Sequence, residues 1–317
     1  MYKVMIRDNM SSLAKEILEK TGKIEVVIDN DKKTNDPKEL SKIIGEFHGI
    51  GIRSGTKITK KVLENAKNLK VIGRAGVGVD NIDSAAAKEK GIVVMNTPGG
   101  NAVTTAEHAI SMMMALSRNI PQGTMTLKSG KWEKKKLIGV EITDKILGIV
   151  GLGKIGKIVA DRATGLHMKV IASDPFVTKE DAKSFGAELV DIEEIYKNAD
   201  FITLHVPKLD ETHNMINTSI LNKMKKGVRI INCSRGEVIN LDDLYNALVN
   251  GHVAGAALDV FPVEPPDASM PIMQLDKVIL TPHLGASTSD AQIKVAEMLA
   301  NQMAKLLIDG EIINSVN

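Results

Sequence analysis

The sequence predicts an α/β fold with two domains, each built around a parallel sheet. Short apolar runs of strand length alternate with helical patterns along the whole chain, which is the pattern of βαβ units. One of these runs, residues 146–150, leads into three glycines spaced as G-x-G-x-x-G. The chain has 317 residues, and a length of about 100–200 residues per domain makes two domains the natural division.

The glycine motif is the organising element of the sequence. Gly151 permits a tight turn, Gly153 lets a pyrophosphate approach the backbone, and Gly156 allows the following helix to pack close to the strand. The start of that helix offers N–H groups and a positive dipole end to phosphates. A second strand, residues 169–173, ends at Asp174, whose carboxylate can accept hydrogen bonds from both ribose hydroxyls. No arginine follows at 175–177, so we expect NAD rather than NADP. A purely structural turn and the nucleotide site of a methyltransferase are the alternatives.

Composition excludes several classes of function. The formal net charge is +2, which provides no long-range field for nucleic acid or an acidic membrane surface. The single cysteine, Cys233, permits no intrachain disulfide and suits a reducing compartment. The N-terminal residues lack the apolar core of a signal peptide, and no apolar run approaches the roughly 18 residues of a membrane span. We expect a soluble cytoplasmic protein and no metal ion.

The first part of the chain, residues 1–96, predicts an α/β domain of its own. Gly22 ends the first expected helix, Pro37 opens the second and Asp83 caps a later one that ends before Gly91. Strands are expected at 4–6, 24–28, 49–52, 71–74 and 92–95.

A turn-rich segment, residues 97–101, is a candidate hinge between the domains. A long helix should follow, from Thr104 or Thr105 to about Asn119, with Pro121 stopping it. Its methionines, residues 112–114, indicate core or interface packing.

The βα rhythm continues after Asp174. The last helix is expected over about 288–308, because apolar residues there form one stripe, and another helix over 241–249. Further strands are expected at 200–204, 228–232, 254–258 and 278–280.

Polar residues follow the ends of these later strands, where ligands bind in doubly wound sheets. Arg235, Glu264 and His283 each come shortly after a strand of the same expected sheet. A histidine can take a hydroxyl proton near neutral pH, a carboxylate can fix its tautomer, and an arginine can pair with a carboxylate. Together they suit oxidation of a 2-hydroxy acid, although each residue alone would more often be structural. Asp259 either touches the nicotinamide or caps the next segment.

Several motifs in order resemble those of the D-isomer-specific 2-hydroxyacid dehydrogenases. They are GLGKIG with Asp174, HVP, INCSRGEVIN, GAALDVFPVEPP and TPHLGAST, and the resemblance covers essentially the whole chain. It implies His283 as acid/base, Glu264 as its partner and Arg235 as the binder of the substrate carboxylate. The residues that would line NAD are Val77, Gly151, Gly153, Lys154, Ile155, Gly156, Asp174, Val206, Cys233, Ser234, Arg235, Asp259, His283, Gly285 and Ala286.

The segments IRSGTKIT, GRAGVGVDNID and NTPGGNAVTTAEHAISMMMALSRNIPQ look most like the members of that family that oxidise D-3-phosphoglycerate to 3-phosphohydroxypyruvate on the way to L-serine. In them Arg53 and Ser54 would face the substrate phosphate, with Asn101 nearby. Backbone amides of Val77 and Gly78 would help Arg235 and His283 hold the rest of the substrate. Gly55 offers the phosphate loop no extra side chain.

The resemblance also implies a discontinuous, flavodoxin-like outer domain of residues 1–96 and 288–317, a Rossmann-type NAD-binding domain of residues 97–287, and closure between them over the substrate. Family members are typically homodimers, and Trp132 and Lys134 match a segment that can reach the partner's site. Because the sequence ends soon after His283, we expect no serine-sensing domain.

Three other functions stay open. Two are within the family, namely a glyoxylate or hydroxypyruvate reductase and a D-lactate-type enzyme. The third is an NADH-sensing binding protein of the same fold.

Overall fold

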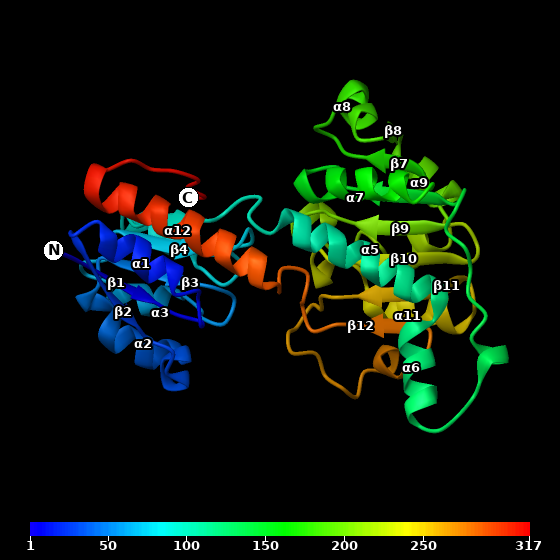
Figure 1. Cartoon of the computed structure of the whole chain (residues 1–317), viewed down its shortest axis with the longest axis horizontal. Coiled ribbons are helices and arrows are strands. Elements are labelled where there is room, and N and C mark those ends of the chain that lie inside the picture. Colours follow the sequence, from blue (N-terminus) through cyan, green and yellow to red (C-terminus); the bar gives the residue numbers. More distant parts are fainter. The chain divides into compact units, whose positions relative to one another are not determined.

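The computed structural model describes residues 1–317, which divide into two compact units (Figure 1). One unit contains residues 1–101 and 286–317, and the other contains residues 102–285. Each unit has its own parallel sheet with helices on both faces, so the α/β fold class predicted from the sequence is confirmed. No helix is both long enough and apolar enough to cross a membrane.

The sheet of the first unit has five parallel strands in the order β2-β1-β3-β4-β5, which is the flavodoxin-like order. Its strands are β1 (Tyr2–Ile6), β2 (Ile24–Ile28), β3 (Gly49–Ile52), β4 (Val71–Arg74) and β5 (Val93–Met95). Its helices are α1 (Leu13–Lys20), α2 (Pro37–Ile43), α3 (Lys60–Glu64), α4 (Ser84–Glu89) and α12 (Ser289–Asp309).

Alternate residues of β1 explain the two cores of this unit. Val4 and Ile6 point to the face covered by α1 and α12, whereas Met5 points to the face covered by α2, α3 and α4. Such strands are apolar on both faces because helices exclude water from each side. The carboxylate of Asp83 accepts a hydrogen bond from the N–H of Ala86 at the start of α4, as the sequence predicts.

The sheet of the second unit has seven parallel strands in the order β12-β11-β10-β9-β6-β7-β8. In this Rossmann-type order the chain reverses direction across the sheet between β6 and β9, and ligands bind at such a switch point. Its strands are β6 (Ile146–Val150), β7 (Lys169–Ser173), β8 (Ala187–Leu189), β9 (Phe201–Leu204), β10 (Val228–Asn232), β11 (Val253–Leu258) and β12 (Val278–Leu280). Its helices are α5 (Ala102–Arg118), α6 (Ile120–Lys128), α7 (Lys154–Gly165), α8 (Lys179–Ser184), α9 (Ile192–Asn198), α10 (Thr218–Leu221) and α11 (Leu241–Val249).

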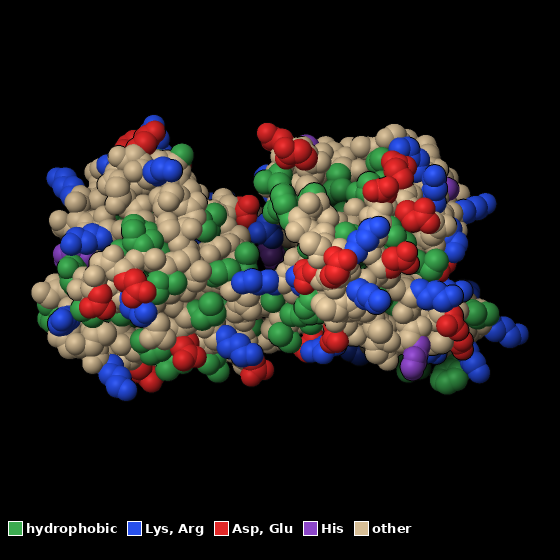
Figure 2. Space-filling model, turned by 90° about the horizontal axis from the view of Figure 1, so that it is seen from above, with side chains coloured by type: hydrophobic (Ala, Val, Ile, Leu, Met, Phe, Trp, Pro, Cys, Tyr) green, Lys and Arg blue, Asp and Glu red, His purple; other side chains and the backbone are tan.

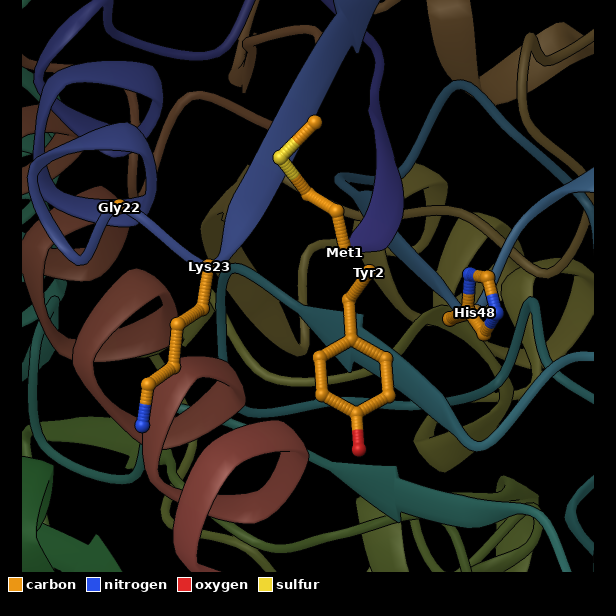
Figure 3. Close-up of a pocket in the computed structure, with 5 residues that line it drawn as sticks. All are labelled: Met1, Tyr2, Gly22, Lys23 and His48. Carbon is orange, nitrogen blue, oxygen red and sulfur yellow. The ribbon is translucent and has the colours of Figure 1, made fainter.

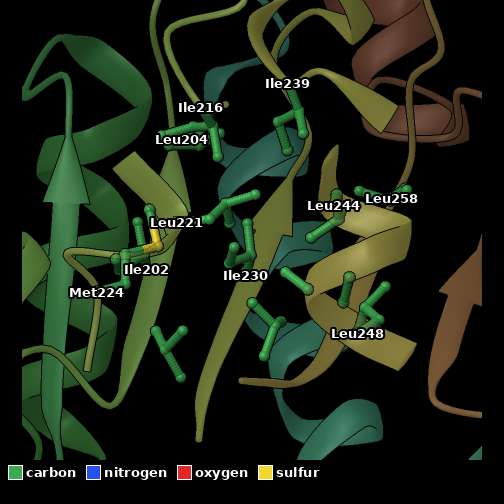
Figure 4. Packing of buried hydrophobic residues seen from close by; sticks show 14 of the residues in the cluster. Ile202, Leu204, Ile216, Leu221, Met224, Ile230, Ile239, Leu244, Leu248 and Leu258 are labelled. Carbon is green, nitrogen blue, oxygen red and sulfur yellow. The ribbon is translucent and has the colours of Figure 1, made fainter. Parts of the chain in front are cut away.

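Two buried clusters lie on opposite faces of this sheet. Figure 4 shows one of them, in which Ile202 of β9 and Ile230 of β10 pack with Leu244 and Leu248 of α11. On the other face α5 and α7 cover the sheet, and Met112 and Met113 are buried there. The methionine run is therefore largely core.

The sequence-based interpretation of Pro121 was wrong. The long helix α5 already ends at Arg118, and Asn119 has φ 52°, in the left-handed region that ends helices. Pro121 lies in the first turn of a new helix, α6, where a missing N–H costs nothing. The helix α6 and the short strand β8 were not predicted.

Candidate active site

The residues predicted to bind the cofactor and to act on the substrate follow the carboxyl ends of strands in the second unit. All strands of this sheet are parallel, so these ends share one edge. Gly151 follows β6, Asp174 follows β7, Val206 follows β9, Arg235 follows β10 and His283 follows β12.

Gly151 and Gly156 have the close backbone contacts expected of them, and the surroundings of Gly153 are open. Gly151 has φ 92°, and a Cβ there would lie 2.6 Å from the carbonyl oxygen of His205. A Cβ on Gly156 would lie 2.2 Å from the carbonyl oxygen of Gly151, whereas a Cβ on Gly153 would meet nothing within 4 Å. The turn is therefore tightly packed at Gly151 and Gly156 but open at Gly153, directly before α7 begins at Lys154. This open cradle at a helix N-terminus fits a pyrophosphate.

Asp174 holds the glycine turn itself. One of its carboxylate oxygens accepts a hydrogen bond of 2.7 Å from the N–H of Leu152, and the other accepts one of 2.9 Å from the N–H of Phe176. A carboxylate has about four acceptor positions, so these bonds leave room for ribose hydroxyls. The acid fixes the turn and stays available for the cofactor.

His283 and Glu264 form a pair. Nδ1 of His283 lies 2.7 Å from Oε2 of Glu264, and Oε1 of Glu264 accepts a hydrogen bond of 3.1 Å from the N–H of Phe261. The second bond orients the carboxylate, and the first engages Nδ1 of His283 rather than Nε2. Side-chain exposures of 47% and 37% keep the pair within reach of solvent and substrate.

Asp259 is the anchor of the turn that carries His283. Its buried carboxylate accepts hydrogen bonds from the N–H groups of Leu284 (2.7 Å) and Gly285 (2.8 Å), and its carbonyl oxygen accepts one from the N–H of His283 (2.8 Å). Burial alone would raise the pKa of Asp259. The hydrogen bonds from His108, Thr281, Leu284 and Gly285 outweigh burial and hold this pKa below its usual value. Asp259 thus caps the turn that carries His283, and its contact with the nicotinamide stays a prediction.

His108 and Thr281 were not predicted. Nε2 of His108 lies 3.1 Å from the Asp259 carboxylate and 3.2 Å from the Thr281 hydroxyl, and that hydroxyl donates to the same carboxylate at 2.6 Å. His108 is on α5, far from Asp259 in the sequence. Only the fold brings them together.

A buried asparagine shapes the turn that carries Arg235. Oδ1 of Asn232 accepts hydrogen bonds from the N–H and hydroxyl of Ser234, and its Nδ2 donates to the carbonyl of Arg235. Nη1 of Arg235 donates to the carbonyl of Ser234 at 2.7 Å.

Cys233 precedes this turn. Burial raises the pKa of Cys233, with the Asp259 charge adding to the effect. The Cys233 thiol therefore stays uncharged at neutral pH.

The remaining predicted residues belong to the first unit. Arg53 and Ser54 follow β3, Val77 and Gly78 follow β4, and Asn101 ends the segment after β5. They therefore lie at the carboxyl edge of the five-stranded sheet, the edge where parallel sheets bind ligands. Ala286 is the first residue of the returning segment of this unit.

Figure 3 shows a hollow at the opposite edge of that sheet. It is lined by residues that precede β1, β2 and β3 or begin them, namely Met1, Tyr2, Gly22, Lys23 and His48. Nδ1 of His48 accepts a hydrogen bond of 3.0 Å from the N–H of Lys3. No residue predicted for the site lies there.

Residues 110–285 match the profile of the D-isomer specific 2-hydroxyacid dehydrogenase NAD-binding domain. The chain belongs to this family. Its second unit is thus an NAD-binding domain, and NAD is its cofactor. The glycine cradle and the Asp174 carboxylate fit that cofactor.

Curated relatives extend the similarity to the whole chain. The D-3-phosphoglycerate dehydrogenase of Synechocystis sp. is 46% identical over 317 residues, which are 100% of this chain and 56% of the relative. The protein of the same name from Methanocaldococcus jannaschii is also 46% identical, over 100% of this chain and 59% of the relative. The chain thus spans less than three fifths of the length of these relatives.

Solved structures share the complete fold. The TT0316 protein of Thermus thermophilus is 30% identical with a TM-score of 0.89, covering 99% of this chain and 100% of that one. D-lactate dehydrogenase of Escherichia coli is 26% identical with a TM-score of 0.86, covering 99% and 100%. A glyoxylate reductase from Paecilomyces is 26% identical with a TM-score of 0.87, covering 99% and 98%.

Proposed function

We propose that the protein catalyses the NAD-dependent oxidation of D-3-phosphoglycerate to 3-phosphohydroxypyruvate, a step of L-serine biosynthesis. The 2.7 Å contact between His283 and Glu264 carries the chemistry. The names of the relatives that match over the whole of this chain and the position of Arg53 support the phosphorylated substrate.

His283 is the acid/base of the proposed reaction. With Nδ1 directed to Glu264, Nε2 takes the proton of the substrate hydroxyl, and in reduction it returns that proton to the oxygen. The carboxylate of Glu264 fixes the tautomer and stabilises the imidazolium that forms. NAD, held by the glycine turn and Asp174, would supply the acceptor for the hydride of the carbon that bears this hydroxyl.

Arg235 holds the substrate carboxylate. Its guanidinium is a planar set of donors that matches a carboxylate, and the Asn232 hydrogen bonds fix the turn from which it projects. The backbone amides of Val77 and Gly78 assist it, and Arg53 and Ser54 receive the phosphate with Asn101 beside them. The residues that hold the cofactor are those set out from the sequence, with Gly151 to Gly156 around the pyrophosphate and Asp174 at the ribose.

The roles of the domains follow from these assignments. We propose residues 1–96 and 288–317 as the substrate domain and residues 97–287 as the cofactor domain.

Exposed apolar side chains support a homodimer. Met125 and Leu127 of α6 are 68% and 60% exposed, and Trp132 and Ile138 beyond it are each 82% exposed. We take these exposed apolar side chains, which lie close together in the sequence, as candidates for the contact between two copies of the chain. On the face seen in Figure 2, acidic and basic side chains are interspersed among hydrophobic ones.

We also propose that the enzyme is cytoplasmic, because its single cysteine suits a reducing compartment.

A second function within the family is favoured by Gly55, which adds no side chain to the phosphate loop. It is reduction of an unphosphorylated 2-keto acid such as glyoxylate, hydroxypyruvate or pyruvate. The fold similarity to D-lactate dehydrogenase and glyoxylate reductase is compatible with this alternative.

One assay distinguishes these functions. Purified protein and NADH are mixed with 3-phosphohydroxypyruvate, hydroxypyruvate, glyoxylate, pyruvate or 2-ketoglutarate, and the loss of nicotinamide absorbance is followed. We expect kcat/KM to be highest for the phosphorylated acid. A preference for an unphosphorylated acid would move the enzyme to the reductase branch, and no turnover on any of them would favour an NADH-sensing binding protein.

A further inference from the structure

The loop of residues 53–56 is short and polar, and side chains of the first unit hold it by hydrogen bonds. It follows β3 directly. Ser54 is exposed and Arg53 is half-buried, but Thr56 at its end is completely buried. The two residues proposed to meet the phosphate thus project from a loop whose last side chain is anchored inside the first unit.

Asp8 forms the first clamp on this loop. Oδ2 of Asp8 accepts hydrogen bonds from the N–H groups of Arg53 (2.7 Å) and Thr56 (3.2 Å), and Oδ1 accepts one from the Thr56 hydroxyl (2.7 Å). One carboxylate therefore ties both ends of the loop. Asp8 follows β1 with φ 60°, a left-handed conformation that aspartate tolerates better than most residues.

Asn81 forms the second clamp. Its Nδ2 donates hydrogen bonds to the carbonyl oxygens of Arg53 (2.8 Å) and Thr56 (2.6 Å). Asp8 thus binds the N–H groups of the same two residues whose carbonyls Asn81 binds. Both ends of the loop are fixed from two sides.

A buried cation fixes the clamp in turn. Arg7 is 1% exposed, and its Nε donates to the Thr56 hydroxyl at 3.0 Å. Its Nη1 pairs with Asp29 and donates to Thr34, and its Nη2 donates to Asn35 at 2.8 Å. Because the Thr56 hydroxyl accepts from Arg7, its own proton is directed to Asp8. A buried network in which each nitrogen of the guanidinium has a hydrogen-bond partner restricts the loop to one conformation.

We propose that Asp8 and Asn81 are positioning residues for the substrate phosphate, which act by holding the Arg53–Thr56 loop in the conformation that presents Arg53 and Ser54. This inference rests on the proposed function. A loop that is already ordered loses less conformational freedom when it binds an anion, so its affinity is higher. Neither residue touches the substrate, and the hydride-transfer step does not depend on them.

The test compares single substitutions in the full chain. Asp8→Ala removes the first clamp and Asn81→Ala removes the second. Arg53→Ala shows how far KM for the phosphorylated acid rises when the arginine itself is lost.

Asn9→Ala is the matched control, because Asn9 is also left-handed, with φ 48°, and its exposed side chain makes no hydrogen bond to the loop. Asp8→Asn is the conservative variant, since its amide oxygen can still accept from both N–H groups. KM and kcat are measured with 3-phosphohydroxypyruvate and with hydroxypyruvate, alongside the dissociation constant for NADH.

We expect Asp8→Ala and Asn81→Ala to raise KM for the phosphorylated acid about tenfold, as ordering of a binding loop predicts. The kcat and the NADH dissociation constant should stay within about twofold of wild type, and KM for hydroxypyruvate should change much less. Asp8→Asn should restore most of the affinity.

Two other results have different meanings. If Arg53→Ala raises KM for the phosphorylated acid but Asp8→Ala behaves like Asn9→Ala, the positioning role is overturned and the proposed function stands, even if Asp8→Ala melts at a lower temperature. If Arg53→Ala leaves that KM unchanged, the phosphate assignment itself is wrong, and the positioning role is overturned with it.

Discussion

The carbonyl oxygen of Gly151 occupies the place that a side chain on Gly156 would need. A Cβ at position 156 would lie 2.2 Å from this oxygen, well inside any allowed contact. The first turn of α7 and the end of β6 are therefore in direct backbone contact. Gly153, two residues after the first of these glycines, has no such neighbour.

This difference predicts that alanine at position 156 lowers the stability of the fold, whereas alanine at position 153 lowers the affinity for NADH. Gly156→Ala should destabilise the protein by about 1–3 kcal/mol, because overpacking forces the helix from the strand. Gly153→Ala should leave the free energy of unfolding within about 0.5 kcal/mol but weaken NADH binding, since the added methyl group occupies the open cradle. Urea unfolding and NADH fluorescence titration measure the two effects. Unchanged NADH affinity in Gly153→Ala would place the pyrophosphate elsewhere.

The His283–Glu264 pair gives a prediction about turnover. His283→Ala should lower kcat by a factor of about 10² to 10⁴, which is the contribution of a positioned general acid or base. NADH binding should persist, because the side chain acts on the substrate proton. Glu264→Gln should retain more activity than His283→Ala, since the histidine remains. Near-normal turnover in His283→Ala would show that the base is another residue.

His205 predicts a pH dependence of stability. Its Nε2 lies 2.9 Å from the Thr203 hydroxyl, its Nδ1 is buried without a partner, and burial lowers the pKa of His205 to about 4. In the unfolded chain the same histidine has the ordinary pKa of about 6.5. Between the two pKa values, His205 is therefore protonated in the unfolded chain and neutral in the folded protein. Stability should therefore fall as the pH is lowered from about 6.5 to about 4, and this contribution should be constant below that range.

Urea unfolding at pH 7 and pH 4.5 tests this prediction. His205→Asn should lose less stability between these pH values than wild type, because its side chain does not titrate. Equal losses in the two proteins would mean that His205 takes up its proton without unfolding.

The buried pair of Arg7 and Asp29 gives a prediction about folding stability. Asp29→Ala leaves the guanidinium of Arg7, 1% exposed, without its charged partner, and such a loss costs about 3–5 kcal/mol. Glu39→Ala is the control, because Glu39 pairs with Lys42 on the surface and should cost less than about 1 kcal/mol. Comparable losses of stability in the two variants would show that the pair around Arg7 is hydrated after all.

The strands were predictable because burial on both faces leaves a nearly continuous apolar run. Residues 228–232 and 146–150 are examples, and both form strands of the expected length. The break between α5 and α6 was not predictable. Asn119 can continue a helix or end it in the left-handed conformation, and only the packing around it decides.

The same limit applies to the site. His283 and Glu264 were identified because their residue types suit one reaction and because each follows a strand of one sheet. The partners of Asp259 were not, since His108 comes from a helix more than a hundred positions earlier. The clamp formed by Asp8 and Asn81 was missed for the same reason, because no local pattern marks a side chain that binds a distant backbone.

The helix α12 has a consequence for the order in which the protein is made. It covers one face of the sheet formed by β1 to β5, together with α1. A ribosome synthesises α12 only after the whole of the second unit, residues 102–285. The nascent first unit therefore leaves the ribosome with this face, which carries Val4, Ile6 and Val71, covered by α1 but not yet by α12. The second unit, continuous in sequence, can complete its core first, and the part of the apolar face that α12 covers stays exposed until translation has passed residue 309.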